Sequence, residues 1–278
     1  MRKFIGNNPI TLTERNFIKD EQYYITKKLD GKRYLLYFSE DGVSRVSSKN
    51  ETEKVSLPKS SKNIPGTVLD TEYYKGKYYV FDILFFKDTD KRYTSLKERI
   101  KLYNHITDKV VKSKKLVSKK YYKTKDMCVD FPYMIRKYHK DIKLGELDGL
   151  ILTPLSSYYS PVYKWKPVEL LSIDFKIKRI KKNNKLLYHL LTPNGSLFAP
   201  KNKKYSDVGI LDLSEEPEVY KKYKDNSVVE FVFKDDTFVP IRARPDKKNS
   251  NGMNVILDNF TEIIRPTDLN KLFCLKKN

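Results

Sequence analysis

The segment Lys28–Arg33 reads KLDGKR, which places a lysine just before a glycine turn and among other cations. A lysine amine is a nucleophile only after it loses its proton, and neighbouring positive charge with partial desolvation lowers the pKa of such an amine. Lys27, Lys32 and Arg33 supply that charge. The segment therefore predicts that Lys28 is a nitrogen nucleophile, although a chain with 56 Lys and Arg residues also forms basic clusters by chance.

Further short strings follow Lys28 in a fixed order and combine carboxylates, an aromatic strand and paired cations. They are DTE at 70–72, FDIL at 81–84, ELDGLI at 146–151, KWKP at 164–167 and RARPDK at 242–247. Carboxylates bind hard metal ions, cations stabilise phosphates, and an aromatic ring stacks on a base. With a lysine nucleophile, these are the parts that a nucleotidyl-transfer site needs.

The same residues also have purely structural interpretations. Lys164 and Lys166 share one face of an extended segment, and such a pair on an edge strand discourages aggregation. The other candidates would then be strand-end carboxylates, a core ring and a solvated strand face, namely Glu72, Asp148, Phe81, Arg242 and Arg244.

The N-terminal strings lie among predicted strands. Residues 33–38 read as a buried strand closed by a turn at 40–42, and residues 44–65 read as strand fragments and loop. Two more strands, at 68–69 and 78–86, are joined by a turn at 75–77. The sequence therefore predicts that DTE at 70–72 stands at a strand end.

Two helices follow these strands. Ser95 and Glu98 form a capping-box pattern, and apolar residues then recur at helical spacing from Leu96. A second helix is expected from near Asp130, with Pro132 in its first turn.

Beyond residue 173 the pattern changes to short alternating segments that predict a compact β-barrel with few helices. The expected strands are 174–180, 185–191, 227–233 and 237–241, with turn signals at 193–195 and 234–236. Residues 268–273 predict a short terminal helix.

Composition limits the class of protein. A chain of 278 residues suggests one large or two unequal domains, and 39% hydrophobic with 13% aromatic residues is enough for a folded core. The net charge of +21 points to a polyanionic partner: nucleic acid, nucleotide phosphates or an anionic membrane surface. Heavy Lys, Tyr and Asn usage would also follow from an A/T-rich genome.

The two cysteines, Cys128 and Cys274, form no zinc-ligand set and no disulfide framework. We therefore expect free thiols in a reducing compartment. The three histidines show no metal spacing and are not expected to be catalytic. The N-terminus lacks an apolar signal region, and no stretch approaches 18 apolar residues, so we expect an intracellular protein that is not secreted and does not span a membrane.

The ordered strings resemble the covalent nucleotidyltransferase superfamily, which holds mRNA-capping guanylyltransferases and ATP-dependent polynucleotide ligases. The resemblance runs from Lys28 to about Lys247. Three sets of residues indicate the capping branch: DGLI with Thr153-Pro154, KWKP with SIDF at 172–175, and RPDK at 244–247. Most DNA ligases lack the last of these motifs. The VEF string at 229–231 also fits. One departure is Thr71, where the family usually has glycine, so the backbone there must have negative φ.

The resemblance implies an α+β fold. A nucleotidyltransferase domain of antiparallel sheets and helices would occupy residues 1–173, and an OB-fold β-barrel would occupy residues 174–264. Residues 265–278 would return to the first domain, with a hinge near residue 173.

The resemblance also implies an activity, in which GMP passes from GTP through a covalent Lys28–GMP intermediate to the 5′-diphosphate end of RNA. Arg33 and Glu72 would hold the ribose, Phe81 would stack on guanine, and Arg45 would be a further nucleotide contact.

Asp148 would help to bind Mg²⁺ or Mn²⁺, and Lys164 with Lys166 would meet the α-phosphate. The RARPDK string at 242–247 would bind the leaving pyrophosphate through Arg244, Asp246 and Lys247. GTP and 5′-diphosphate RNA are the implied partners, with a separate RNA triphosphatase and cap methyltransferase. The cytoplasm, a virus factory or the nucleus would be the location, and a large DNA virus is a source that fits.

Two alternatives stay open. An ATP-dependent RNA or DNA ligase would share Lys28, Glu72 and the paired lysines. A catalytically silent, basic RNA-binding subunit would keep the fold, but intact charged residues at every motif position argue against it.

Overall fold

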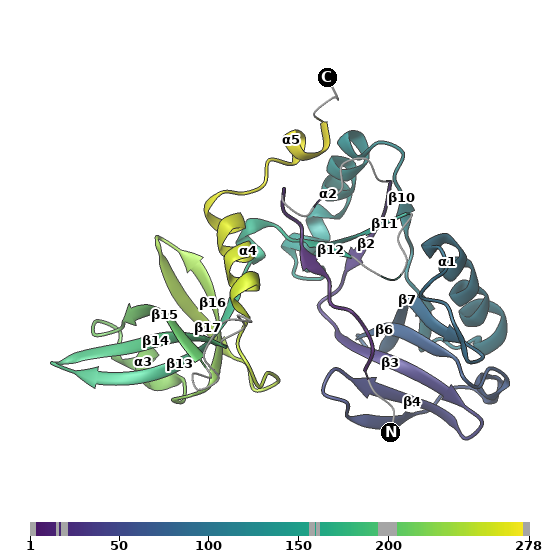
Figure 1. The fold of residues 1–278 in the computed structure, drawn as a ribbon, viewed down its shortest axis with the longest axis horizontal. Helices are drawn as coiled ribbons and strands as arrows, with labels where there is room; N and C mark the ends of the chain where they lie inside the picture. The colour runs from purple at the N-terminus through teal and green to yellow at the C-terminus, as the bar shows by residue number, and fades with distance from the viewer. Residues whose placement is uncertain are drawn as a thin grey trace. The chain divides into compact units, whose positions relative to one another are not determined.

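The computed structural model describes residues 4–14, 17, 22–155, 159, 162–193 and 205–274. The chain divides into two compact units (Figure 1): unit 1 contains Met1–Lys166 and Asp268–Asn278, and unit 2 contains Pro167–Thr267. The chain thus changes unit after Lys166 and again at Asp268, where the sequence suggested 173 and 265. The turn expected at 194–195 lies outside the described residues.

Unit 1 contains two sheets. The smaller, called here the β2 sheet, has the strand order β1-β12-β11-β2-β10. Its strands are β1 (Ile10–Thr11), β2 (Tyr23–Lys28), β10 (Tyr122–Lys123), β11 (Gly149–Pro154) and β12 (Tyr163–Trp165). Neighbours are antiparallel except β1 and β12.

The larger sheet, called the β7 sheet, has the order β5-β4-β3-β6-β7-β8, with β9 also paired to β7 in parallel. Its strands are β3 (Lys32–Ser39), β4 (Gly42–Ser47), β5 (Thr52–Val55), β6 (Val68–Tyr74), β7 (Lys77–Phe86), β8 (Thr89–Asp90) and β9 (Leu116–Ser118). The predicted strands at 33–38 and 78–86 are confirmed. The DTE string lies inside β6, so its placement at a strand end was wrong.

Capping residues mark the N-terminus of both long helices of unit 1. Helix α1 (Leu96–His105) has the predicted capping box between Ser95 and Glu98, and it continues as a π-helical segment over Ile106–Val111. Helix α2 (Met127–Lys143) begins earlier than expected because Asp126, not Asp130, caps it. A short 3-10 helix covers Lys59–Asn63.

Each sheet of unit 1 buries one apolar face under helices. Leu36, Leu69 and Ile83 of the β7 sheet pack with Tyr103 of α1. The β2 sheet packs against α2 and the terminal helix α5 (Leu269–Cys274) through a cluster that includes Ile25, Leu150, Leu152, Phe131 and Leu272. Each fully buried side chain of this size contributes about 1.5–3 kcal/mol to stability, so both sheets are anchored firmly. No helix within the described ranges is long and apolar enough to span a membrane.

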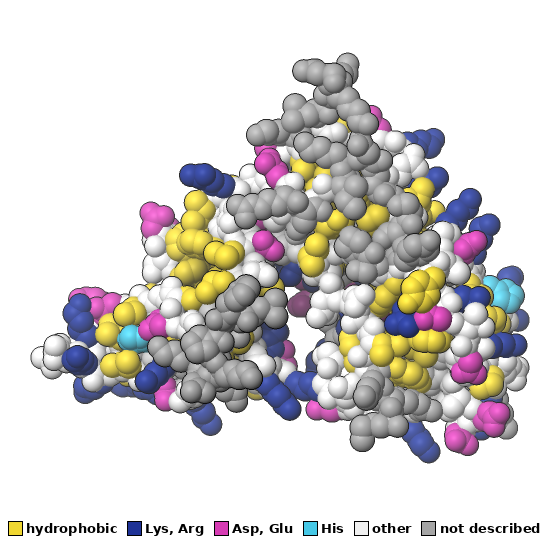
Figure 2. Space-filling model, in the orientation of Figure 1, with side chains coloured by type: hydrophobic (Ala, Val, Ile, Leu, Met, Phe, Trp, Pro, Cys, Tyr) yellow, Lys and Arg dark blue, Asp and Glu magenta, His cyan; other side chains and the backbone are white. Residues whose placement is uncertain are grey.

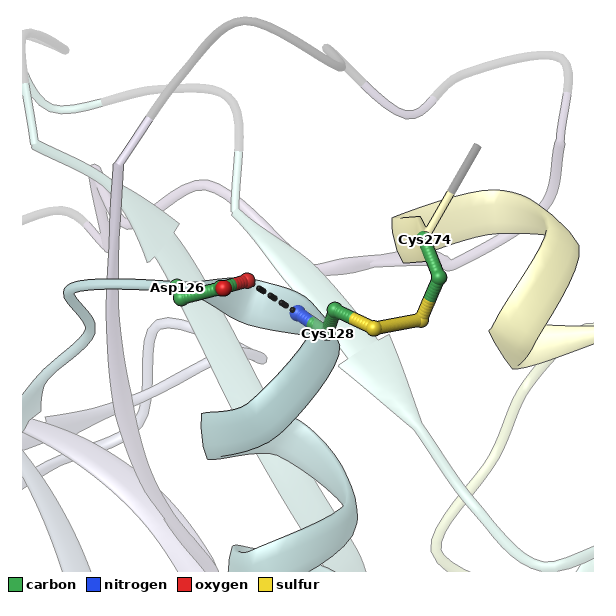
Figure 3. The surroundings of a disulfide bond; sticks show 3 residues. All are labelled: Asp126, Cys128 and Cys274. Atoms are coloured by element: carbon green, nitrogen blue, oxygen red, sulfur yellow. Dashed lines mark hydrogen bonds between the residues drawn. A yellow bond between two sulfur atoms is a disulfide. The ribbon is translucent and has the colours of Figure 1, made fainter. Parts of the chain in front are cut away.

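The expectation of free thiols was wrong. Cys128, in the first turn of α2, and Cys274, at the end of α5, form a disulfide with a Cα–Cα distance of 4.9 Å (Figure 3). The two cysteines are 146 residues apart in sequence, so nothing local indicates their pairing. They meet because the C-terminal helix belongs to unit 1 and packs on α2 through Leu272.

Unit 2 is built on a five-stranded antiparallel sheet with the order β15-β14-β13-β16-β17. Its strands are β13 (Ile173–Lys182), β14 (Lys185–Pro193), β15 (Tyr205–Asp212), β16 (Val228–Lys234) and β17 (Thr237–Ala243). The order is that of an open sheet, because the outer strands β15 and β17 do not pair within the described residues. The predicted closed barrel is therefore not seen in this part of the chain.

Unit 2 also contains helices that the sequence pattern did not reveal. They are the 3-10 helix Val168–Leu170, α3 (Pro217–Lys222) and α4 (Met253–Ile264). Ile256 and Phe260 of α4 join the core formed by the sheet. The strand β15 was likewise missed, because its residues are largely exposed and carry little apolar pattern.

Candidate active site

Lys28 ends β2, and its ammonium group is bonded to the carboxylate of Asp148. The backbone N–H of Asp148 donates to the carbonyl of Lys28 at 2.8 Å, and Gly149 pairs with Lys28 across the strands. Gly149 has φ of 139°, and a Cβ added there would lie 2.1 Å from the carbonyl oxygen of Trp165. Glycine is therefore required at this position, and the close strand contact that it permits places Asp148 beside Lys28.

A second lysine completes this cluster. Lys166 Nζ lies 2.6 Å from Asp148 Oδ1, so one carboxylate bridges two ammonium groups. The three side chains are only 17–21% exposed, which strengthens their electrostatic interactions. With two positive charges and one negative charge, the cluster has a net positive charge that suits an anionic ligand such as a phosphate.

Strand register decides which lysines face the site. Thr26 and Lys28 lie two apart in β2 and share a face. Ile151 pairs with Thr26 on one side and with Lys164 of β12 on the other, so Lys164 belongs to this face too. Lys27 points to the opposite face, where its Nζ lies 3.1 Å from Asp141 Oδ2.

The positive charge expected around Lys28 is distributed differently. Lys27 is neutralised by Asp141. Arg33 binds Asp70 through two hydrogen bonds, Nε–Oδ1 at 2.9 Å and Nη2–Oδ2 at 2.6 Å. The nearest partners of Lys28 are instead Asp148 and, through it, Lys166. Lys27 and Arg33 thus each have a carboxylate partner of their own, and the charged group in direct contact with Lys28 is Asp148.

The DTE string positions Arg33. Asp70 is fully buried and accepts a further hydrogen bond from the Tyr159 hydroxyl at 2.5 Å. Thr71 has negative φ, as the departure from the family pattern required. Its hydroxyl donates to the carbonyl of Tyr34 at 2.8 Å, so threonine fits because the backbone of β6 is extended here. Glu72 lies two residues on from Asp70 and shares its face.

Lys119 is a site residue that the sequence analysis missed. Its Nζ lies 2.7 Å from Glu72 Oε2 and 5.4 Å from the centre of the Phe81 ring, and its side chain is only 7% exposed. Burial lowers the pKa of Lys119, while Glu72 acts in the opposite direction. Lys119 belongs to a lysine-rich segment that composition would place on the surface. It is buried because its N–H donates to the carbonyl of Val80 at 2.7 Å, next to the β9–β7 pairing.

These groups surround one pocket of unit 1. Arg33 lies over the Phe81 ring at 5.4 Å from its centre, so that the ring is flanked by the cations of Arg33 and Lys119. The pocket brings together predicted site residues and two that were not predicted: Lys28, Arg33, Glu72, Phe81, Lys119 and Tyr159. A half-buried aromatic ring beside cations and a lysine pair suits a nucleoside phosphate.

Arg45 lies elsewhere in the β7 sheet. Its Nε donates to Glu53 Oε2 at 3.1 Å and its Nη1 to the hydroxyl of Tyr78 at 3.1 Å. The guanidinium also covers the Tyr34 ring at 4.6 Å. Arg45 does not occur among the described residues that line the pocket.

The RARPDK string at 242–247 contributes to a network of ion pairs within unit 2. Arg244 Nη1 lies 3.0 Å from Asp174 Oδ1 and 3.3 Å from Glu230 Oε2, and Arg244 Nη2 lies 2.9 Å from Asp246 Oδ2. Lys247 is bonded to Asp174. The hydrogen bond from Arg244 lowers the pKa of Asp246. The predicted residues of this string are thus brought together, with Asp174 as their anchor.

Metal ligands are few at the site. No group of three His, Cys, Asp or Glu side chains in the described part of the chain is arranged to hold a metal ion. Asp148 offers one carboxylate, whose oxygens bind Lys28 and Lys166. Mg²⁺ in nucleotide sites is often held by one or two carboxylates together with substrate phosphates and waters. The site therefore fits Mg²⁺ or Mn²⁺ only as an ion shared with a nucleotide.

Comparison with solved structures defines the class of fold. A mycobacterial DNA ligase D complexed with ATP and MES aligns with 87% of this chain and 95% of its own chain, with a TM-score of 0.50 and 15% sequence identity. The fold is therefore that of the ligase-like nucleotidyltransferases, with mixed α and β content.

The sequence identifies the family. The family model for the mRNA capping enzyme, catalytic domain, matches residues 1–168, and the chain belongs to this family. It is 28% identical to a probable mRNA-capping enzyme of Acanthamoeba polyphaga mimivirus, over 84% of this chain and 29% of that protein. It is 24% identical to an mRNA-capping enzyme of Mus musculus, over 97% of this chain and 49% of that protein. The chain thus spans about half or less of these relatives.

Proposed function

We propose that this chain is an mRNA guanylyltransferase that uses Lys28 as its nucleophile. The observation that carries the proposal is the cluster of Lys28, Asp148 and Lys166, in which Lys28 also lines the pocket that contains Phe81 and Arg33. After losing its proton, the Lys28 amine forms a bond to the α-phosphorus of GTP. The bond from that phosphorus to the bridging oxygen breaks, and pyrophosphate leaves.

In the second step, a terminal oxygen of a 5′-diphosphate RNA attacks the phosphorus of the Lys28–GMP adduct. The nitrogen–phosphorus bond breaks, the lysine amine is recovered, and a GpppN cap results. Dividing the transfer into two displacements is covalent catalysis.

The lysine cluster would bind the α-phosphate. Asp148 binds both Lys28 and Lys166, so an incoming phosphate can replace it as their partner. Lys164, on the same face, would add a third cation. Asp148 would then hold Mg²⁺ or Mn²⁺ together with the phosphates, and the ion would stabilise the charge that develops on them.

The nucleoside would occupy the pocket itself, with its base on Phe81 and its ribose near Arg33 and Glu72. Lys119 supports guanine over adenine. Its ammonium group is a donor, and guanine offers the O6 acceptor where adenine offers an amino donor.

For unit 2 we propose a completed OB-fold, with Arg244, Asp246 and Lys247 in contact with the leaving pyrophosphate. The network on Asp174 supports this role because it keeps guanidinium and ammonium groups ordered. Ordered cations are effective where charge develops in a transition state.

The proposed reaction also defines the chemistry around it. A 5′-triphosphate RNA must lose its γ-phosphate before this step, so an RNA triphosphatase has to supply the substrate. A cap methyltransferase would use the product. Both would act where RNA is made, in the nucleus, the cytoplasm or a virus factory.

The proposal is tested by incubating the protein with α-labelled GTP or ATP and a divalent cation, followed by a denaturing gel. Label from GTP that stays with the protein and passes to diphosphate-ended RNA is the expected result. Label from ATP with sealing of nicked strands would identify a polynucleotide ligase. Absence of label from both nucleotides would identify a silent RNA-binding subunit.

A further inference from the structure

A second hollow of unit 1, of about 900 Å³, lies between α1 and the segment that carries β9. It adjoins the nucleotide pocket, because Lys119 and Tyr121 line both. The hollow has well-fixed walls. The capping box fixes the start of α1, and the buried Arg99 of α1 bonds Asp82 of β7 at 2.8 Å. β9 is paired to β7 on the other side.

The lining of this hollow is strongly basic. Its exposed cations come from α1, from the loop before β9 and from the residue after Lys119: Lys97, Lys101, Lys112, Lys114 and Lys120. We call this surface the lysine groove. The acidic residue among its lining residues is Asp108, which accepts a hydrogen bond from Thr107 at 3.0 Å.

The cations of the lysine groove are not neutralised. Among the described side chains, none of its five exposed lysines forms an ion pair. In a neighbouring hollow of unit 1, Lys27 and Lys75 are paired with Asp141 and Glu146, while Lys120 lines both hollows. The lysine groove thus combines five exposed lysines with one acidic residue among its described lining residues.

We propose that the lysine groove binds the phosphate backbone of the RNA whose 5′ end is being capped. The inference rests on the proposed function, which makes a single-stranded RNA the substrate. Lys97 and Lys101 lie one turn apart on α1, and the remaining cations come from other segments, so the surface suits an extended polyanion better than one phosphate. Contacts to phosphates carry no sequence information, which suits an enzyme that must accept many RNA sequences.

Other features of the groove agree with this ligand. Tyr24, Tyr121 and Ile100 add aromatic and apolar lining between the cations. Single-stranded nucleic acids bind where a positively charged groove is combined with such surfaces. Lys and Arg side chains recur along the edge of unit 1 where α1 lies (Figures 1 and 2).

The test compares RNA binding by the wild-type protein and by the variant Lys97→Ala/Lys101→Ala/Lys114→Ala. Fluorescence anisotropy with a single-stranded RNA of about 20 nucleotides measures Kd as a function of salt. We expect Kd to rise about 10-fold at moderate salt, and the slope of log K against log salt to fall in magnitude by about 2, because each lost phosphate contact contributes about 0.7. A Lys→Arg version of the same variant keeps the charge and should retain wild-type binding.

A matched control removes the same charge elsewhere on unit 1. Lys49, Lys54 and Lys62 are exposed and lie outside the lysine groove. The variant Lys49→Ala/Lys54→Ala/Lys62→Ala should bind RNA with nearly the wild-type salt slope. If both triple variants lose affinity equally, net charge alone attracts RNA and the groove has no role. Wild-type binding by the groove variant would also overturn the inference.

Two further measurements separate the groove from the active site. The groove variant should form the GMP adduct at the wild-type rate and should cap a diphosphate-ended dinucleotide normally, while its KM for the long RNA rises. Equal losses with both RNA lengths would overturn the inference. If the wild-type protein forms no adduct, the proposed function fails, and the anisotropy result still decides the groove. Tighter binding of an acidic phosphopeptide than of RNA, lost in the groove variant, would assign the surface to a protein partner instead.

Discussion

Lys27 and Lys28 are neighbours in β2, yet their ammonium groups lie on opposite faces of the same sheet and meet different carboxylates. Lys28 is bonded to Asp148, whereas Lys27 Nζ lies 3.1 Å from Asp141 and 4.5 Å from the centre of the Tyr138 ring. The alternation of a strand thus separates two side chains that sequence alone would treat as equivalent.

This separation makes the identity of the nucleophile testable. Lys28→Ala should abolish covalent labelling from α-labelled GTP, because Lys28 lines the pocket, whereas Lys166, the other amine bonded to Asp148, is not among the described residues that line it. Lys27→Ala is the matched control and should retain the label, since its side chain faces away from the pocket. The measurement is a denaturing gel with both variants. Labelling that survives in Lys28→Ala and disappears in Lys27→Ala would reverse the assignment.

Asp148 should be essential for adduct formation. Asp148→Ala removes the carboxylate that bridges Lys28 and Lys166, and we expect labelling to fall by about 10²-fold or more, as for other charged groups at a reacting centre. Asp141→Ala, which removes the partner of Lys27, is the control. An excess of chelator should stop labelling in the wild type. Full activity in chelator would show that Asp148 acts without a metal ion.

Lys119 should determine which nucleotide is used. Lys119→Met keeps an apolar stem beside Phe81 but removes the donor, and we expect the preference for GTP over ATP to fall by about 10-fold or more. The measurement is the ratio of adduct formation rates with the two nucleotides. Lys115→Ala, an exposed lysine of the same segment, should leave the ratio unchanged. An unchanged ratio in Lys119→Met would leave Lys119 with a structural role only.

The Arg244 network should matter for the first step alone, because pyrophosphate is present only when GTP reacts. Arg244→Ala and Lys247→Ala should slow adduct formation by about 10²-fold, while transfer of GMP from the isolated adduct to RNA should be nearly normal. Lys181→Ala is the control, since Lys181 is an exposed cation of β13 outside this network. Single-turnover kinetics measure the rate of each step in each variant. Normal adduct formation with failed transfer would mean that these residues bind RNA.

Lowering the pH should reduce the stability of unit 2, because Glu230 becomes protonated. Burial alone would raise the pKa of Glu230, but hydrogen bonds from Ser172 and Arg242 and the charge of Arg244 bring it below its ordinary value. A carboxylate with a lowered pKa stabilises the folded state above its unfolded pKa, and that contribution disappears as the pH falls through the folded pKa.

The variant Glu230→Gln should therefore be less stable than the wild type at neutral pH by about 2 kcal/mol, the scale of hydrogen bonds to a charged group. The difference should shrink as the pH falls below the unfolded pKa of this carboxyl group. Denaturant titrations that follow unit 2 across this range measure it. A difference that is constant with pH would show that the ionised form of Glu230 is not what stabilises unit 2.

Features set by neighbouring residues could be predicted from the sequence. The capping box of α1 depends on Ser95 and Glu98 alone, and most residues of β3 and β7 are apolar or aromatic. Lys28, Asp148 and Lys166 could also be predicted, because each lies in a motif and the order of these motifs along the chain resembles that of the family. The family model then confirmed the class of protein independently.

Features set by distant parts of the chain could not be predicted. Lys119 is buried only because β9 pairs with β7, and Cys274 meets Cys128 only because the terminal helix packs on α2. Arg45, a nucleotide contact by the family resemblance, is likewise paired with Glu53, its neighbour across the strands β4 and β5. Burial and pairing of this kind are tertiary properties that no local pattern encodes.

Since the chain enters unit 2 after Lys166 and leaves it before Asp268, while both flanking segments belong to unit 1, unit 2 is an insertion and not an appendage. It is held by two covalent tethers, and the second is secured to α2 through the Cys128–Cys274 bond. The topology of the chain therefore joins both ends of unit 2 to segments of unit 1.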